Sequence, residues 1–266
     1  LAPGSYSFTV QNPGTNRPSA IWAFVVQEAQ TPIIDSVKAG SSTIPNGGAT
    51  YYQSNISISG SASPGHQIEI YDGATLLGSV PTTNTGSWTL LARNFSFGGH
   101  SITARTTDGS NKTSLAYTFT VQQGLSTDIT NFHYGQYNGW ARGNAIQHRD
   151  LTFHFNHGQY VLNNYTYTNW SNGVLLYKTF YNLQPNATYY FTIRIARFYP
   201  QYAPPYIRLR TDQSAGQAWY IHTAAMSNLT ISFSSTTPQL TLYIDSLEVS
   251  GVGNDWDMAW IQVSKA

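Results

Sequence analysis

Three turn-rich segments in the second half of the chain combine aromatic rings with planar polar groups, at residues 134–144, 163–173 and 197–206. A flat aromatic face stacks on the C–H face of a sugar ring, and the sugar hydroxyls pair with planar amide, carboxylate or guanidinium groups. Loops on a rigid scaffold often carry such contacts. The segments therefore predict a glycan-binding surface, with core or edge packing of the same rings as the alternative. Its candidate residues are Tyr137, Trp140, Arg142, Trp170, Tyr199 and Tyr202.

Carboxylates are scarce, with 12 Asp and Glu among 266 residues, and they are scattered over turns and strand ends. Glycoside hydrolysis needs two carboxylates that face one bond. The sequence has neither a G-x-S-x-G nor a Walker-type motif. His148, His154 and His157 lie close in sequence, but without cysteine or an H-E-x-x-H pattern they predict no zinc site. We therefore expect a protein that is not an enzyme.

The composition favours a β protein that binds neither nucleic acid nor membrane. Tyr, Trp, Phe, Thr, Ser, Asn and Gly are abundant, and no long segment has helical apolar periodicity. The net charge is +1, without a Lys/Arg cluster that would indicate a nucleic-acid footprint. No apolar run approaches the roughly 20 residues that span a bilayer. The absence of cysteine excludes disulfides.

An internal repeat sets the organisation of the first half. Residues 1–27 reappear as residues 95–122, with one extra residue in a Gly/Asn-rich turn. Gly4 falls on Gly98, and after the insertion Phe24 falls on Phe119. Each copy has the alternation of two strands joined by a turn. The chain thus begins near the end of one repeat and continues through a whole one, which indicates a piece of a longer tandem array. We expect a monomer within that longer chain.

Residues 29–122 have the pattern of a β-sandwich. Strands are expected at residues 33–38, 56–60, 66–73, 74–80 and 86–92 and in the repeated pair, with turn signals about every 8–12 residues. Residues 44–50 form a turn-rich crossing. Ile68, Ile70 and Trp88 are the expected inward positions. Residues 1–28 are then the last two strands of a preceding repeat.

The first half resembles a known family. The runs GSASPGHQIEIYDGATLLGSV and FGGHSITARTTDGSNKTSLAYTFTV, residues 60–80 and 97–121, are similar to the bacterial immunoglobulin-like repeats of large surface and secreted proteins. The resemblance implies an immunoglobulin-like sandwich, an extended stalk, and an extracellular or bacterial cell-surface location.

The second half, residues 127–266, has no copy of the repeat. Its runs GVLLYKTF, YNLQPNATYYFTIRIAR and GNDWDMAWIQV resemble the jelly-roll carbohydrate-binding modules of bacterial glycoside hydrolases and adhesins. That family often has an acid-rich closing strand, which Asp255, Asp257 and Ile261 match, whereas Ala259 and Trp260 replace the expected acids. The resemblance also implies a structural calcium, which takes six to eight oxygen ligands. Asp128 and Asp257 are its candidate ligands.

The sequence thus predicts an all-β chain, an immunoglobulin-like β-sandwich followed by a jelly-roll β-sandwich. Its predicted function is a non-catalytic fragment of a bacterial surface or secreted protein, in which a stalk presents a glycan-binding module. Two alternatives remain. One is the receptor-binding region of a secreted toxin, whose partner is a host cell-surface receptor. The other is a structural spacer or cap without a ligand, in which the loop aromatics only pack.

Overall fold

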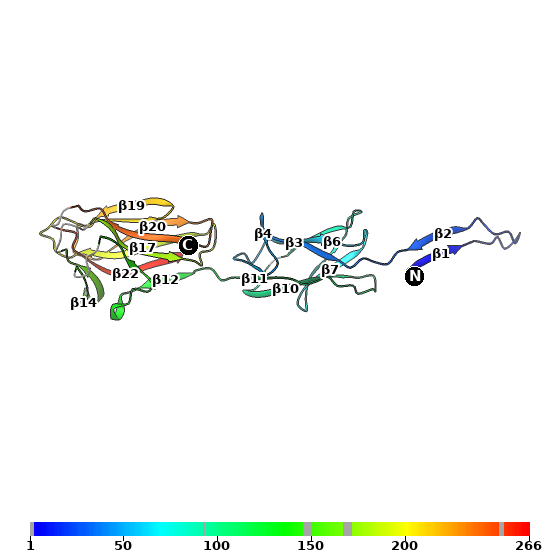
Figure 1. Cartoon of the computed structure of the whole chain (residues 1–266), viewed down its shortest axis with the longest axis horizontal. Helices are drawn as coiled ribbons and strands as arrows, with labels where there is room; N and C mark the ends of the chain where they lie inside the picture. Colours follow the sequence, from blue (N-terminus) through cyan, green and yellow to red (C-terminus); the bar gives the residue numbers. More distant parts are fainter. Residues whose placement is uncertain (1–2, 93, 146–149, 167–171, 250–252) are drawn as a thin grey trace. The chain divides into compact units, whose positions relative to one another are not determined.

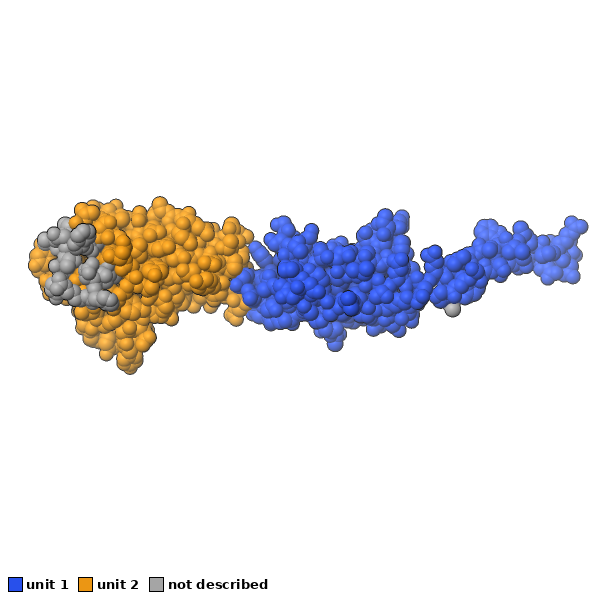
Figure 2. Space-filling model, in the orientation of Figure 1, with its two compact units in different colours: residues 1–122 blue, residues 123–266 orange. Residues whose placement is uncertain are grey.

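The computed structural model describes residues 3–92, 94–145, 150–166, 172–249 and 253–266. The chain divides into two compact units, residues 1–122 (unit 1) and 123–266 (unit 2), coloured separately in Figure 2. Apart from a single 3-10 turn, η1 (His133–Gly135), the regular elements of the described residues are β-strands (Figure 1). The all-β prediction is confirmed. Within the described residues, the structure contains no helix with the length and apolarity needed to cross a membrane.

The sandwich of unit 1 consists of two sheets. The first has the order β4-β3-β6-β9, with β4 (Ser42–Ile44), β3 (Ile33–Ala39), β6 (Ile56–Ser61) and β9 (Ser87–Ala92). The second has the order β5-β11-β10-β7-β8, with β5 (Gly48–Thr50), β11 (Tyr117–Val121), β10 (Gly98–Thr106), β7 (Gln67–Asp72) and β8 (Thr75–Pro81). In chain order β3, β6 and β9 match strands A, B and E of an immunoglobulin domain, and β7, β10 and β11 match C, F and G. This arrangement confirms the predicted immunoglobulin-like fold.

The core of unit 1 lies between these sheets. Ile68, Ile70 and Trp88 are buried there, as their alternation in the sequence predicts. Trp88 also explains a glycine on the neighbouring strand. A Cβ at Gly60 would lie 1.9 Å from the carbonyl oxygen of Ile33 and 2.4 Å from the ring of Trp88. Only glycine fits this close approach of backbone and ring.

A separate two-stranded sheet precedes the sandwich. It contains β1 (Gly4–Phe8) and β2 (Trp22–Val26), which pair with each other in antiparallel register. No other described strand pairs with either of them. We call β1, β2 and their connecting turn the N-terminal hairpin.

Unit 2 is a second sandwich of two sheets (Figure 1). Sheet I has the order β14-β15-β22-β17-β20, with β12 also paired to β22: β12 (Thr127–Thr130), β14 (Leu151–Asn156), β15 (Gln159–Asn164), β22 (Trp256–Lys265), β17 (Thr188–Arg197) and β20 (Ser227–Ser234). Sheet II has the order β13-β16-β21-β18-β19: β13 (Ala141–Arg142), β16 (Gly173–Phe180), β21 (Leu240–Ser246), β18 (Tyr206–Thr211) and β19 (Ser214–Tyr220). The second predicted β-sandwich is therefore present.

The core of unit 2 follows from alternation along the strands. On β17, Phe191, Ile193 and Ile195 are fully buried, and they pack with the inward side chains of β18 and β21. The intervening residues of β17 face away from the core. The sandwich therefore has two outer faces on which polar and aromatic side chains are held at the spacing of the strands.

Candidate functional site

An open cleft lies on the outer face of sheet I, beside the loop that joins β17 to β18. Its volume is about 370 Å³. The lining combines carboxylate, hydroxyl, imidazole and amide groups with three aromatic rings. The residues are Asp150, Thr152, His154, Asn163, Tyr165, Phe198 and Tyr199.

Strand periodicity places the polar side chains in the cleft. On β14, Leu151 packs into the core, so its neighbours Thr152 and His154 at alternate positions are on the outer face. The register pairs Thr152 with Asn163 on β15, and the Thr152 hydroxyl contacts the Asn163 side-chain oxygen at 3.4 Å. Two paired strands therefore present a hydroxyl, an imidazole and an amide on one surface.

A buried carboxylate holds this polar surface in place. Asp257 on β22 has no exposed surface, and it accepts hydrogen bonds from the Nδ2 atoms of Asn163 at 2.8 Å and Asn156 at 2.6 Å. The Nε2 atoms of His154 and His157 lie 3.5 Å and 3.3 Å from its oxygens. Because a buried carboxylate requires such partners, the Asn163 and His154 side chains are fixed before any ligand arrives.

The aromatic wall of the cleft comes from the loop after β17. The loop is anchored where the Phe198 amide donates to the Asp255 carbonyl at 2.9 Å. The Phe198 ring lies 5.6 Å from the His154 ring, and the Tyr199 ring lies 5.3 Å from Tyr165 and 6.2 Å from Tyr202. The Tyr202 side chain is 38% exposed. These contacts make a connected row of rings, of which the outermost faces solvent.

Two further acids lie at this end of sheet I. Asp150 and Asp255 are both buried, and the Asp255 carboxylate accepts a hydrogen bond from the Thr166 amide at 2.7 Å. Burial raises the pKa of Asp255, the Thr166 amide lowers it, and the charge of Asp150 raises it further. Buried carboxylates held by the backbone and by amides are poorly placed to reach both sides of a glycosidic bond.

Of the predicted ligand-binding residues, Tyr199 lines this cleft, and Tyr202 lies next to Tyr199. The prediction for Trp140 was wrong, because its ring is only 4% exposed and stacks on the core ring of Phe191 at 5.7 Å. No sugar can stack on a ring that is buried to this extent. Its place in the chain, directly before the short strand β13, turns it inward.

Tyr137 and Arg142 lie beside that core and not at the cleft. Tyr137 packs against Phe132 and Phe153, and its hydroxyl accepts a hydrogen bond from Arg142 Nε at 3.0 Å. Burial raises the pKa of Tyr137, while the charge and the hydrogen bond of Arg142 lower it. This pair braces the segment before β13. Trp170, the remaining predicted ring, lies outside the described residues.

The two predicted calcium ligands are far apart. Asp128 pairs with Val263 on β22, six positions from Asp257, which corresponds to about 20 Å along a strand. Asp128 binds Lys178 Nζ at 2.9 Å, and Asp257 is surrounded by nitrogen groups. Neither environment fits a cation that needs oxygen ligands. Within the described ranges, no group of three or more His, Cys, Asp or Glu side chains could hold a metal ion.

Six cleft residues were not among the predicted site residues: Asp150, Thr152, His154, Asn163, Tyr165 and Phe198. The signal for His154 was present, because it alternates with Leu151 and Phe153, which pack in or against the core. Asn163 could not be found in this way, because β15 has no clear apolar alternation and was not predicted as a strand.

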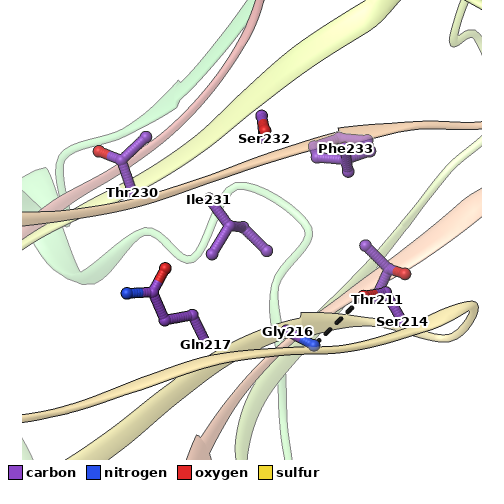
Figure 3. Close-up of a pocket in the computed structure, with 8 residues that line it drawn as sticks. All are labelled: Thr211, Ser214, Gly216, Gln217, Thr230, Ile231, Ser232 and Phe233. Carbon is purple, nitrogen blue, oxygen red and sulfur yellow. Dashed lines mark hydrogen bonds between the residues drawn. The ribbon is translucent and has the colours of Figure 1, made fainter.

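A second hollow of about 320 Å³ lies between the edge strands β19 and β20. Figure 3 shows Gln217 and Ile231 pointing toward one another from the two strands. Its lining is mainly hydroxyl and backbone, and its single ring, Phe233, is buried. Without an exposed ring it offers no stacking surface for a sugar.

No family model and no curated protein matches the chain. Among solved structures, the C-terminal domain of the sugar-binding protein EclA is 25% identical, with a TM-score of 0.37, over 51% of this chain and 97% of that chain. The CBM22-1 xylan-binding domain from Paenibacillus barcinonensis is 12% identical, with a TM-score of 0.39, over 53% and 97%. A Bacteroides uniformis beta-glucuronidase is 10% identical, with a TM-score of 0.35, over 83% of this chain but only 29% of its own.

Proposed function

We propose that unit 2 is a non-catalytic glycan-binding module and that the cleft beside β14, β15 and the β17–β18 loop is its binding site. The observation that carries the proposal is the meeting of a row of tyrosine rings with fixed polar groups in one open cleft. Tyr199 and Tyr202 supply stacking surfaces, and Thr152 and His154 supply hydrogen-bonding groups.

The size and the rigidity of the cleft support a small saccharide as the ligand. Its volume of about 370 Å³ lies at the lower end of the range for small-molecule sites. Asn163 is 3% exposed and is held by Asp257, and its side-chain oxygen contacts the Thr152 hydroxyl, so a ligand meets a hydroxyl that is already oriented. A preorganised site loses little conformational entropy when it binds its ligand.

Binding without catalysis is favoured by the state of the acids. The carboxylates near the cleft, Asp150, Asp255 and Asp257, are all at most 3% exposed. Hydrolysis requires two carboxyl groups on either side of the bond to be broken. In this site the acids support the lining instead.

We further propose that unit 1 is a segment of an immunoglobulin-like stalk and that the parent protein acts outside the cell or on a bacterial cell surface. The internal repeat and the immunoglobulin-like order of the strands support the stalk. The partner of unit 2 is then a glycan on a surface or in the medium, bound by one copy of the module within a longer chain.

Screening the whole chain against a glycan array, followed by titration calorimetry with the best ligand, tests the proposal. Tyr202→Ala should weaken binding about tenfold, equivalent to about 1.4 kcal/mol, because a stacking face is lost. Tyr177→Ala is the matched control, since this tyrosine of sheet II is 39% exposed against 38% for Tyr202. The control should leave the affinity unchanged.

Three outcomes would argue against glycan binding at this cleft. If the folded chain binds no glycan on the array, the alternative of a structural spacer without a ligand is favoured. Binding to cells that survives enzymatic removal of their glycans favours a protein receptor. An equal loss of glycan affinity in the Tyr202→Ala and Tyr177→Ala variants would show that the binding site is not at the cleft.

A further inference from the structure

The N-terminal hairpin reproduces the geometry of the β10–β11 hairpin inside the sandwich of unit 1. In the hairpin Gly4 pairs with Val26 and Tyr6 pairs with Phe24. At the aligned positions Gly98 pairs with Val121 and His100 pairs with Phe119. The two hairpins therefore have the same strand register, although only one of them lies in a larger sheet.

The turns agree in the same detail. The amide of Val10 donates to the Ser19 hydroxyl at 2.9 Å, and the amide of Ala104 donates to the Ser114 hydroxyl at 3.0 Å. Asn16 has a φ of 52° and its counterpart Asn111 a φ of 53°. The one-residue insertion is thus absorbed in the turn without changing the strands. This agreement makes the second copy a valid template for the surroundings of the first.

The two copies differ in what covers them. Phe8 is 52% exposed and Phe24 is 40% exposed, whereas their counterparts Ile102 and Phe119 are 0% and 2% exposed. Trp22 is 69% exposed on the same face of the hairpin. Aromatic side chains have about 150–250 Å² of surface to bury, so these three rings leave roughly 300 Å² of apolar surface in contact with water. A patch of this size is comparable to the largest apolar patch on many whole monomers, and such patches are often functional.

In the second copy three kinds of contact cover this surface. β7 pairs with the free edge of β10, and β5 pairs with the free edge of β11. Buried side chains of the opposite sheet, such as Ile56 and Ile58, pack in one cluster with Ile102 and Phe119. The N-terminal hairpin has neither edge partner among the described strands.

We propose that the exposed face and both edges of the N-terminal hairpin form a docking surface for a further copy of the strands β3 to β9. That partner has a defined chemistry: it offers two strand edges for backbone pairing and an aliphatic sheet face for Phe8, Trp22 and Phe24. Docking completes a second immunoglobulin-like sandwich in front of the first. The hairpin is then the last two strands of that domain.

A seamless graft tests the proposal. The alignment places residue 1 at the position of Phe95, so a copy of residues 29–94 can be fused directly before the whole chain. Amide hydrogen exchange is measured on the fused and the original chain. In the fusion, the amides of β1 and β2 should gain about 100-fold in protection and reach the level of β10 and β11.

A pair of substitutions separates docking from other effects of the graft. Phe24→Asp places a charge on the proposed docking face, and it should abolish the new protection. Val25→Asp is the control, because Val25 is on the opposite face, and its counterpart Thr120 is exposed in the complete domain. It should leave the protection intact.

Two results would overturn the proposal. In the first, the grafted strands are themselves protected while β1 and β2 stay as unprotected as in the original chain. In the second, the original chain already protects β1 and β2 by pairing with another molecule of itself, as sedimentation velocity would show. The partner would then be the same hairpin of a second copy.

Discussion

Replacing Trp140 separates a core role from a ligand-binding role. Its ring stacks on Phe191 within the core of unit 2, and only 4% of the residue is exposed. Its indole Nε1 is also buried, and it has no hydrogen-bond partner among the described residues. Two substitutions therefore probe different contributions to the free energy of unfolding. Trp140→Ala removes the packing, and Trp140→Phe removes the polar atom but keeps a ring on Phe191.

The expected magnitudes differ strongly. Burial of a tryptophan side chain removes about 150–250 Å² from water, and at about 25 cal/mol per Å² this contributes about 4–6 kcal/mol. Alanine retains part of that contact and leaves a cavity, so Trp140→Ala should reduce the free energy of unfolding by about 3–5 kcal/mol. Trp140→Phe loses less volume and no longer buries an unpaired N–H group. It should cost at most about 2 kcal/mol.

Calorimetric unfolding of the whole chain distinguishes these outcomes. For a unit of this size 1 kcal/mol shifts the Tm by about 2–4 °C, so Trp140→Ala should lower the Tm of unit 2 by about 6–20 °C. Glycan affinity at a temperature where the variant is folded should stay unchanged. A Trp140→Ala variant that keeps its Tm but loses glycan binding would refute the core assignment.

Three further variants test other parts of the structure. Asp255→Asn should be neutral or should raise the free energy of unfolding by up to about 1 kcal/mol at pH 7. The reason is that the pKa of the Asp255 carboxyl is raised in the folded state, so its contribution to stability is lost as the pH rises through that pKa. A gain in stability that is larger at pH 3 than at pH 7 would contradict this. Lys178→Met should lower the free energy of unfolding by about 1–2 kcal/mol, less than for a fully buried pair, because it leaves the Asp128 carboxylate without its ammonium partner; urea unfolding measures the loss, and restoration by added calcium would contradict our view of Asp128. Gly60→Ala should lower the free energy of unfolding of unit 1 by at least about 2 kcal/mol and leave the Tm of unit 2 unchanged. A shift of both Tm values would show that the units do not unfold independently.

Much of the fold could be predicted from the sequence because strand periodicity is local. Alternating apolar residues identified β7 and β9, and their inward positions, such as Ile70 and Trp88, are buried. The internal repeat located the two hairpins, whose registers then proved to be the same. Such patterns can be recognised from residues that are close together in the sequence.

The site was harder to predict because it depends on which way a loop turns. Trp140 and Tyr199 both lie in tyrosine-rich turn segments, with Gly and Asn around Trp140 and Pro around Tyr199. Trp140 enters β13 and turns inward, whereas Tyr199 follows β17 and faces the cleft. β15 and β19 were not predicted, because β15 lacks a clear apolar alternation and β19, an edge strand, is mostly exposed. The direction in which the chain turns at the end of a strand depends on tertiary packing, which the composition of the segment does not encode.

The buried acids connect the low charge of the chain to its proposed role. Four of the 12 acids, Asp150, Asp245, Asp255 and Asp257, are nearly inaccessible in unit 2. Asp257 holds the amides of the cleft, and Asp245 binds the guanidinium groups of Arg208 and Arg210 on the outer face of sheet II. Each carboxylate is thus already paired with nitrogen groups or backbone amides, or lies beside another buried acid. A catalytic acid must instead be free to exchange its proton with the substrate. Acids that are few and largely buried are therefore better suited to keeping neutral side chains in place for binding than to breaking a glycosidic bond.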